Sequence, residues 1–487
     1  MLKNKFRIVH AADLHLGAPF KGLATRGYGG GGSLPAGLRE TLVGATYAAL
    51  ESLVKFCLEV KPHALLLAGD LYNPEGGGLK SLNALKSACQ KLEAANVMVL
   101  MIHGNHDAAN LQPSWSWPEN VHVFRADRVE SIPIFLENER LFLGAPFAAD
   151  FPQEAWDNAD CLAIIHGISH IKGKVTDNLA IRLAEHSQKI IPAQPPEPRL
   201  EDAWKIGLLH CAVGEKASDG EKAYAPCSID DLRRADVDYW ALGHIHKQGM
   251  VTHSPLAWYP GNSQGMHINE TGPKGCLIVD FNEGTEPGVK FQNLAGIEWH
   301  QLEFEANPEM TLSHLQEASF AQVKKIHSER SPAGLKGIIV RLRIYGRTQL
   351  DGWLRGRKHE FETQIQSSIN ELVPFVWLKD IIIETRPALD LGRAIADPGL
   401  LGETLTRIMD ARDRVENSLH LPPDQQADLR DELFASSASP LGDLFNSPAL
   451  RQAGIVAPGN AELASLLEEA AWLCADLLAN EFPGASE

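Results

Sequence analysis

Short apolar runs alternate with helical patterns through the first 290 residues of the chain. Five of the runs end beside Asp, Asn or His, and they cover residues 6–11, 64–68, 97–102, 206–209 and 239–242. Runs of this length, bounded by turn residues, are typical of buried strands. Helical patterns fill several intervals, such as residues 38–60 and 79–95. Strands that alternate with helices predict an α/β layered domain.

The polar residues at these strand ends predict one shared site, because ligands of α/β sheets collect beyond the carboxyl ends of strands. The residues are Asp13-Leu14-His15, Gly69-Asp70, Gly104-Asn105-His106-Asp107, the lone His210, and Gly243-His244-Ile245-His246. Each motif alone is common by chance, whereas the ordered set is informative. Oxygen and imidazole ligands, with one carboxylate able to bridge, suit a pair of divalent cations that promotes displacement at phosphorus. The set contains no thiol, which argues against a structural zinc site.

Beyond residue 295 the pattern changes. Strand patterns at 296–304, 337–345 and 377–384 alternate with helical patterns at 311–328 and 355–372, which predicts a small α+β domain. From about Leu389 the sequence is helical and acidic. The predicted domains are therefore residues 1–294, 295–388 and 389–487.

The charge distribution bears on the partner. Acidic residues outnumber basic ones by 62 to 45, a net charge of −17, which on its face argues against a simple nucleic-acid binder. Residues 391–487 carry −10 of this excess, whereas residues 324–358 hold ten basic and two acidic residues. That stretch is either a solvated surface or a track for a nucleic-acid backbone.

The seven cysteines show no Cys-x-x-Cys pairing, so free or buried thiols in a reducing compartment are expected. No apolar run reaches about 18 residues, and no signal-peptide pattern precedes the first strand. We therefore expect a cytoplasmic protein without a membrane span.

Four segments carry a resemblance to a known family. They are His10-Ala11-Ala12-Asp13-Leu14-His15-Leu16-Gly17, Gly69-Asp70-Leu71-Tyr72-Asn73, Ala241-Leu242-Gly243-His244-Ile245-His246, and Tyr259-Pro260-Gly261-Asn262-Ser263. With these the sequence resembles the calcineurin-like metallophosphoesterase superfamily, and within it the DNA-repair nuclease branch of SbcD/YhaO-like proteins. The resemblance implies an α/β fold: a four-layer αββα catalytic core, a small α+β capping domain and a helical C-terminal region.

The resemblance also implies a role for each site residue. Asp13, His15 and His246 would bind one metal ion, Asn105, His210 and His244 a second, and Asp70 would bridge them. His106 would act on the phosphate as a catalytic residue, and Asp107 would orient it. The cofactors would be two divalent metal ions, with Mn2+ expected.

The implied function is metal-dependent DNA phosphodiester hydrolysis, as an exonuclease subunit in DNA repair. Two alternatives remain: a phosphatase or nucleotide phosphodiesterase on the same fold, and a scaffold that mainly tethers DNA ends. The implied partners are DNA and an SMC-like coiled-coil ATPase that docks on the C-terminal helices, which otherwise pack on their own chain. A homodimer is left open.

Several residues have a competing interpretation. His166 also ends an apolar run and competes with His210 as a ligand, and His10 and His103 are expected to be core histidines. Trp115 and Trp117 either pack under a loop or stack on a base. The glycine run 27–32 is either a surface loop or a substrate loop.

Overall fold

A computed structural model of the chain describes residues 5–20, 36–74, 78–109, 115–146, 160–193, 203–214, 224–388, 390–396, 398–420 and 459–479. The glycine run 27–32 lies outside the described residues. The chain divides into two compact units. The first comprises Met1–Leu302, Ser319–Leu342 and Glu362–Ile381, and the second comprises Glu303–Ala318, Arg343–Phe361 and Ile382–Glu487.

The first sheet is built on four parallel strands, and two of these, residues 64–68 and 98–102, are wholly apolar. Its order is β13-β12-β1-β2-β3-β4. The bounds are β1 Phe6–Ala11, β2 Ala64–Ala68, β3 Met98–Ile102, β4 Val121–Val123, β12 Gly275–Phe281 and β13 Gly288–Asn293. Strands β1 to β4 pair in parallel, and β12 pairs antiparallel with β1. The carboxyl ends of β1, β2 and β3 therefore share one edge.

The second sheet has the order β10-β11-β9-β8-β7-β5-β6. Its strands are β5 Glu130–Glu137, β6 Arg140–Leu143, β7 Asp160–Gly167, β8 Trp204–His210, β9 Tyr239–Gly243, β10 Gly249–His253 and β11 Leu256–Tyr259. Strands β7, β8 and β9 are parallel neighbours, so the residues that follow β8 and β9 also lie at one edge.

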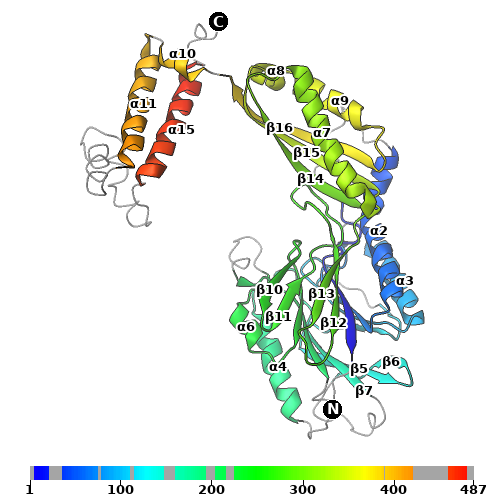
Figure 1. Ribbon diagram of the computed structural model, residues 1–487. Helices are drawn as coiled ribbons and strands as arrows, with labels where there is room; N and C mark the ends of the chain where they lie inside the picture. Colours follow the sequence, from blue (N-terminus) through cyan, green and yellow to red (C-terminus); the bar gives the residue numbers. More distant parts are fainter. Residues whose placement is uncertain are drawn as a thin grey trace. The chain divides into compact units, whose positions relative to one another are not determined.

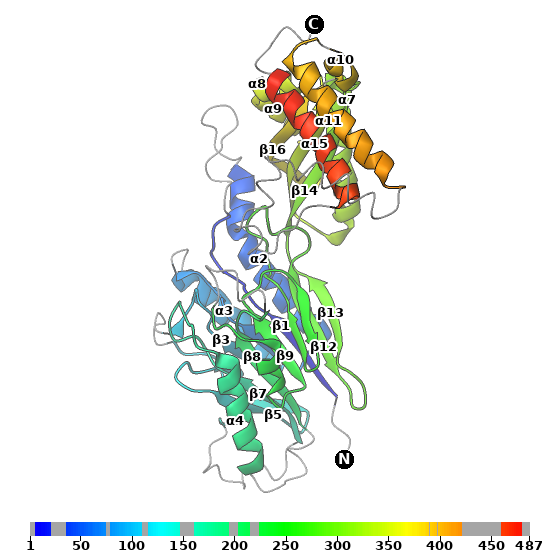
Figure 2. The same ribbon diagram turned by 90° about the vertical axis from the view of Figure 1, so that its left-hand side faces the viewer.

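The two sheets pack face to face, with helices on their outer faces (Figures 1 and 2). Side chains of both sheets, among them Ile8, Leu100, Ile165 and Ile206, form one buried cluster. A second cluster lies under α2 (Ala36–Val60) and α3 (Gly78–Ala94), and a third under α4 (Leu179–Ala193) and α6 (Ile229–Arg233). The predicted α/β class and its four-layer αββα arrangement are confirmed.

Within α2, residues Leu38–Val60 are long and apolar enough to cross a membrane, by length and composition alone. Leu50, Leu53, Val54 and Cys57 of this helix are buried against the first sheet. A core helix meets the same criterion, so the composition is weak evidence for a span.

A three-stranded sheet follows, in the order β14-β15-β16. It comprises β14 Ile297–Ala306, β15 Gly337–Thr348 and β16 Phe375–Pro387, with α7 Leu312–Arg330, a short 3-10 turn at Ser331–Ala333, α8 Asp351–Gly356 and α9 Lys358–Ile369 between strands. Most of the residues predicted as helical over 355–372 are helical, but they belong to two helices, because the backbone leaves helical geometry at Arg357 (φ −124°, ψ 29°). Trp299 and Ile339 of this sheet pack with Phe20 and Leu42 in one buried cluster.

The described part of the C-terminal region is helical, as predicted. Helices α10 (Leu391–Ile395), α11 (Leu400–Ser418) and α15 (Asn460–Ala479) occur there, and α11 and α15 lie side by side (Figures 1 and 2). Leu401, Leu405, Ala471 and Ala475 fill the space between the helices. Within the same unit, Arg347 of β15 makes two hydrogen bonds to Asp476, of 2.8 and 3.0 Å, which tie α15 to the strand.

Candidate metal centre

Every residue predicted for the site follows or ends a parallel strand of one of the two large sheets. Asp13 and His15 follow β1, Asp70 follows β2, and Asn105 and His106 follow β3. From the other sheet, His210 is the last residue of β8, and His244 and His246 follow β9. The site is therefore built from both sheets.

The loops that carry these residues have unusual backbone geometry. Asp13, His15, Asp70 and His244 have positive φ angles of 51°, 44°, 52° and 103°. Left-handed backbone at non-glycine residues costs on the order of 1–3 kcal/mol each and persists only where the surroundings enforce it. Here the Asp13 amide donates to the Gly69 carbonyl at 3.0 Å, and the His15 amide to the Asp70 carbonyl at 3.0 Å. Strain concentrated in this way is typical of functional sites.

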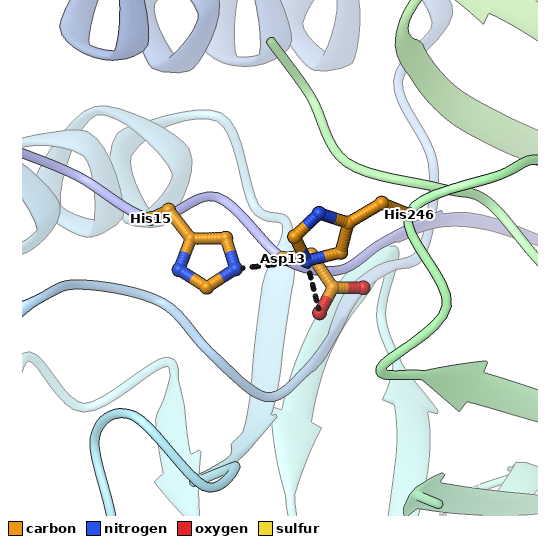
Figure 3. A group of neighbouring side chains, drawn as sticks. All are labelled: Asp13, His15 and His246. Carbon is orange, nitrogen blue, oxygen red and sulfur yellow. Dashed lines mark hydrogen bonds and ion pairs between the residues drawn. The ribbon is translucent and has the colours of Figure 1, made fainter. Parts of the chain in front are cut away.

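Asp13, His15 and His246 form a first group of facing side chains (Figure 3). Nε2 of His15 lies 3.1 Å from Nε2 of His246, and the latter lies 3.9 Å from Oδ1 of Asp13. The Asp13 carboxylate also accepts the His244 amide, at 3.1 and 3.2 Å from its two oxygens. That bond joins the β1 loop to the β9 loop.

His210, Asn105 and His244 form a second group. Nε2 of His210 lies 3.0 Å from Oδ1 of Asn105, and the His210 and His244 rings meet edge to face with centroids 5.2 Å apart. Asp70 lies between the groups, since its Oδ2 is 3.8 Å from Nε2 of His15 and 3.5 Å from Nε2 of His210. One oxygen therefore faces a histidine of each group.

The donor set fits two divalent cations. The ligand atoms of Asp13, Asp70 and His210 lie within 4.8 Å of one another, as do those of Asp13, His15 and His246. At metal–nitrogen distances of about 2.0–2.1 Å, two neighbouring ligands of one ion lie about 3 Å apart. The His15–His246 separation of 3.1 Å matches that spacing.

The buried charges of the site shift one another's pKa values. Burial opposes ionisation of Asp70, but the charges of His210, His15 and His106 outweigh it and hold its pKa well below the usual value. For Asp13 burial dominates, and its pKa is raised despite His246 and His210. Burial alone would lower the pKa of His210, yet the Asp70 carboxylate raises it to about 9. The buried carboxylates of the site therefore favour positive charge close to them, as the raised pKa of His210 shows.

His106 and Asp107 differ in environment. The His106 ring is exposed and meets the His15 ring edge to face, with centroids 5.0 Å apart. Burial of part of the ring lowers the pKa of His106. Asp107 is fully buried, and its carboxylate accepts the amides of Gly104 at 2.7 Å and Leu71 at 2.9 Å. These bonds hold two motif loops together, and the orientation of His106 by Asp107 stays a prediction.

Two residues that the motifs did not single out as ligand supports lie behind the histidines. Asn73 Oδ1 is 2.8 Å from Nδ1 of His15, and Glu270 Oε1 is 2.6 Å from Nδ1 of His246. Asn73 ends the Gly69-Asp70-Leu71-Tyr72-Asn73 segment, but the sequence assigned it no role. Glu270 belongs to no motif, and the mostly polar sequence around it gave no signal of its role.

The competing histidines lie in the core. His10 is fully buried, with Nδ1 2.9 Å from the Tyr239 hydroxyl, and His166 is fully buried with Nδ1 2.7 Å from Ser131 Oγ. Burial lowers the pKa of each to about 3. Trp115 and Trp117 pack, partly buried, against the cluster under α2 and α3, as the packing interpretation predicts.

The basic stretch at residues 324–358 is largely neutralised. All six of its arginines pair with carboxylates: Arg330 with Glu298, Arg341 with Asp380, Arg343 with Glu303 and Glu384, Arg347 with Asp476, Arg355 with Asp351, and Arg357 with Glu360. Most of these acids lie outside the stretch. Its net positive charge is therefore a weaker argument for a nucleic-acid track than the count suggested.

Comparisons with known proteins agree with this geometry. Residues 6–248 match the family model of the calcineurin-like phosphoesterases, and residues 299–386 match that of the middle domain of the metallophosphoesterase YhaO. The chain is 29% identical over 378 residues to the "Uncharacterized metallophosphoesterase YhaO" of Bacillus subtilis (strain 168), which covers 76% of this chain and 79% of the relative.

Solved structures give weaker likenesses. A dimetal phosphatase from Danio rerio is 14% identical, covering 58% of this chain and 98% of that chain, with a TM-score of 0.29. The purple acid phosphatase PPD1 from yellow lupin seeds is 10% identical, covering 60% of this chain and 52% of that chain, with a TM-score of 0.32. At these TM-scores, neither structure is used to assign a family or a function to the chain.

Proposed function

Because the chain belongs to the calcineurin-like metallophosphoesterase superfamily, we propose that it is a metal-dependent DNA phosphodiesterase that acts as an exonuclease subunit in DNA repair. The observation that carries the hydrolytic part is the position of Asp70. Its Oδ2 lies 3.8 and 3.5 Å from the inward nitrogens of His15 and His210, one in each ligand group. A carboxylate so placed suits a bridge between two ions.

Seven residues would hold the ions. Asp13, His15 and His246 would bind the first, Asn105, His210 and His244 the second, and Asp70 both. Mn2+ is the proposed metal, since it accepts this mixture of oxygen and nitrogen ligands. Two bound divalent cations supply Lewis-acid activation of water and neutralise charge on the phosphoryl oxygens.

The side chain proposed to act on the substrate is His106. His106 is exposed, one of its ring nitrogens lies within 4.8 Å of ligand atoms of His15 and Asp70, and its amide donates to Asp70 Oδ1 at 2.8 Å. That bond fixes the loop relative to the bridging carboxylate. His106 would then donate a proton or hydrogen bond to the leaving oxygen, a contribution typically worth about 100- to 10,000-fold in rate.

The DNA substrate is supported by the motif resemblance and by the second domain that follows the phosphoesterase core. The ion pairs of the six arginines favour a second candidate, hydrolysis of small phosphomonoesters or nucleotides, because they reduce the charge available to a DNA backbone.

A comparison of substrates separates the two candidate functions. End-labelled duplex and single-stranded DNA, bis-p-nitrophenyl phosphate and p-nitrophenyl phosphate are each incubated with the full chain in Mn2+, Mg2+, Zn2+ or EDTA. Metal-dependent shortening of DNA supports the proposal, and turnover confined to the small esters contradicts it. His106→Ala should remove hydrolysis, whereas His253→Ala, at an exposed histidine paired with Glu286 at 3.8 Å, should not.

The C-terminal helices are proposed to dock an SMC-like coiled-coil ATPase in the cytoplasm. Leu466 and Leu473 of α15 are 43% and 52% exposed and lie two helical turns apart on one face. Co-purification with a candidate ATPase from the same genome tests this. Leu473→Asp should abolish capture of the ATPase while DNA hydrolysis by the isolated chain is retained, and undiminished capture would refute the docking site.

A further inference from the structure

The site histidines are held by their outer nitrogens. Nδ1 of His210 faces the Ala68 carbonyl at 2.8 Å, and Nδ1 of His15 faces the Asn73 amide oxygen at 2.8 Å. In each case the other nitrogen, Nε2, is directed into the site. A donor–acceptor bond of this kind fixes the tautomer and the ring orientation of a metal-binding histidine.

The partner of His246 is different, because it is a carboxylate. Glu270 Oε1 lies 2.6 Å from Nδ1 of His246, and this separation is shorter than those at His15 and His210. A charged acceptor makes a hydrogen bond roughly twice as strong as a neutral one and makes the imidazole a better ligand.

Glu270 is also rigidly held. It is 7% exposed, and its Oε2 accepts the Asn262 side-chain amide at 3.0 Å and the Met266 backbone amide at 2.7 Å. His267 Nε2 lies 3.3 Å from Oε1. These three contacts, together with the one to His246, leave the Glu270 carboxylate little freedom to rotate.

The negative charge around the two ligand groups is therefore unequal. The first group has Asp13 and Glu270 in addition to the shared Asp70, whereas the second adds to Asp70 the neutral Asn105. Lys274 offsets part of this difference, since its ammonium donates to the His246 carbonyl at 2.9 Å. The balance still favours a cation at the first group.

We infer that Glu270 is a positioning residue for His246, and that it makes the ion held by Asp13, His15 and His246 bind before and more tightly than the ion held by Asn105, His210 and His244. This inference rests on the proposed dinuclear site. It assigns to Glu270 the order in which the two ions bind.

The test is Mn2+ titration of the full chain by isothermal calorimetry and electron paramagnetic resonance. The parent should bind two ions in distinguishable steps. Glu270→Gln keeps the shape and an acceptor oxygen but removes the charge, so it should weaken the tighter step by about 10- to 100-fold and leave the weaker step unchanged. Glu270→Asp, which keeps the charge, should recover part of the loss.

Glu286→Gln is the matched control. It neutralises a carboxylate that also faces a histidine, His253 at 3.8 Å, but both side chains are exposed and outside the site. Both binding steps should match the parent. Circular dichroism melts in EDTA establish that each variant is folded. If Glu270→Gln does not fold, Glu270→Asp replaces it, and its shorter side chain should weaken the tighter binding step by part of the same amount.

The outcomes separate this inference from the proposed function. If the parent binds two ions and degrades DNA but Glu270→Gln keeps both parent affinities, or loses both equally, the role of Glu270 is refuted alone. If binding is ordered and depends on Glu270 but DNA is not degraded, the DNA nuclease proposal fails and the inference stands. A parent that binds no Mn2+ overturns both.

Discussion

Gly104 is packed so closely against two site residues that a single methyl group should disable the centre. A Cβ built at Gly104 would lie 2.7 Å from the Asp70 amide nitrogen and 2.8 Å from Cε1 of His210, where ordinary contacts begin at 3.4 Å. Gly104→Ala must therefore displace both groups, His210 by roughly 0.6 Å. Overpacking of this kind costs about 1–3 kcal/mol of folding free energy.

The functional loss should be comparable to the loss of stability, since a 100-fold fall in rate corresponds to about 2.7 kcal/mol. A misplacement of about 1 Å at a reacting centre can cost about 100-fold in rate, and Gly104→Ala should move two of the proposed ligands together, Asp70 and His210. We expect kcat/KM for a phosphodiester to fall by about 100-fold in saturating Mn2+, with weaker ion binding by calorimetry and a lower Tm in EDTA.

Gly44→Ala is the control for this substitution. Gly44 lies within α2, and a Cβ there would meet nothing within 4 Å. Alanine should leave hydrolysis unchanged and stabilise the helix by up to about 1 kcal/mol. Parent-like Mn2+ affinity and turnover in Gly104→Ala would refute the claim that the spacing of these loops sets the site.

Three further predictions concern stability. Burial lowers the pKa of His166 from 6.5 to about 3 in the folded chain. As the pH falls from about 6.5 toward 3, the unfolded chain binds a proton that folded His166 does not, so the unfolding free energy decreases. His166→Gln should remove about 2 kcal/mol of the difference in unfolding free energy between pH 7 and pH 5, measured in urea. Arg347→Ala removes two hydrogen bonds to Asp476 and a stacking contact 4.0 Å from the centroid of the Trp472 ring. Amide exchange in residues 460–476 should therefore accelerate. Unchanged exchange would contradict the docking of α15 on β15. Saturation with Mn2+ at 100 times Kd should raise the unfolding free energy by about 2.7 kcal/mol per site, and EDTA should reverse the rise in Tm.

Much of the site could be predicted because its determinants are local. Asp13, Asp70, Asn105 and His244 each follow an apolar run that reads as a strand, and parallel strands place such residues at one edge. The sharp turn after β2 is also visible in sequence, because glycine adopts a positive φ angle without steric cost. Gly69 has a φ of 86°. The bounds of residues 64–68 were predicted as β2 has them, because a run of five apolar residues has little alternative to burial, whereas the less apolar strands β4, β5, β6 and β10 were not predicted.

What could not be predicted depends on contacts distant in sequence. Glu270 supports His246 from 24 residues away, through a loop whose path depends on hydrogen bonds to Asn262 and Met266. The charge of the 324–358 stretch was misleading because partners such as Asp380 and Asp476 lie 39 and 129 residues from their arginines. A local sum cannot include them. The break at Arg357 differs, because it has a local signal in Gly356, the last residue of α8.

Each ligand group draws on both sheets, and this has a consequence for the newly made chain. Asp13, His15 and Asn105 are synthesised more than 100 residues before His244 and His246. A chain still emerging from the ribosome holds only fragments of each group until the β9 loop has been released and the second sheet has formed. If the proposed function holds, ion binding should require a completed core, and a truncated or misfolded product should lack hydrolytic activity.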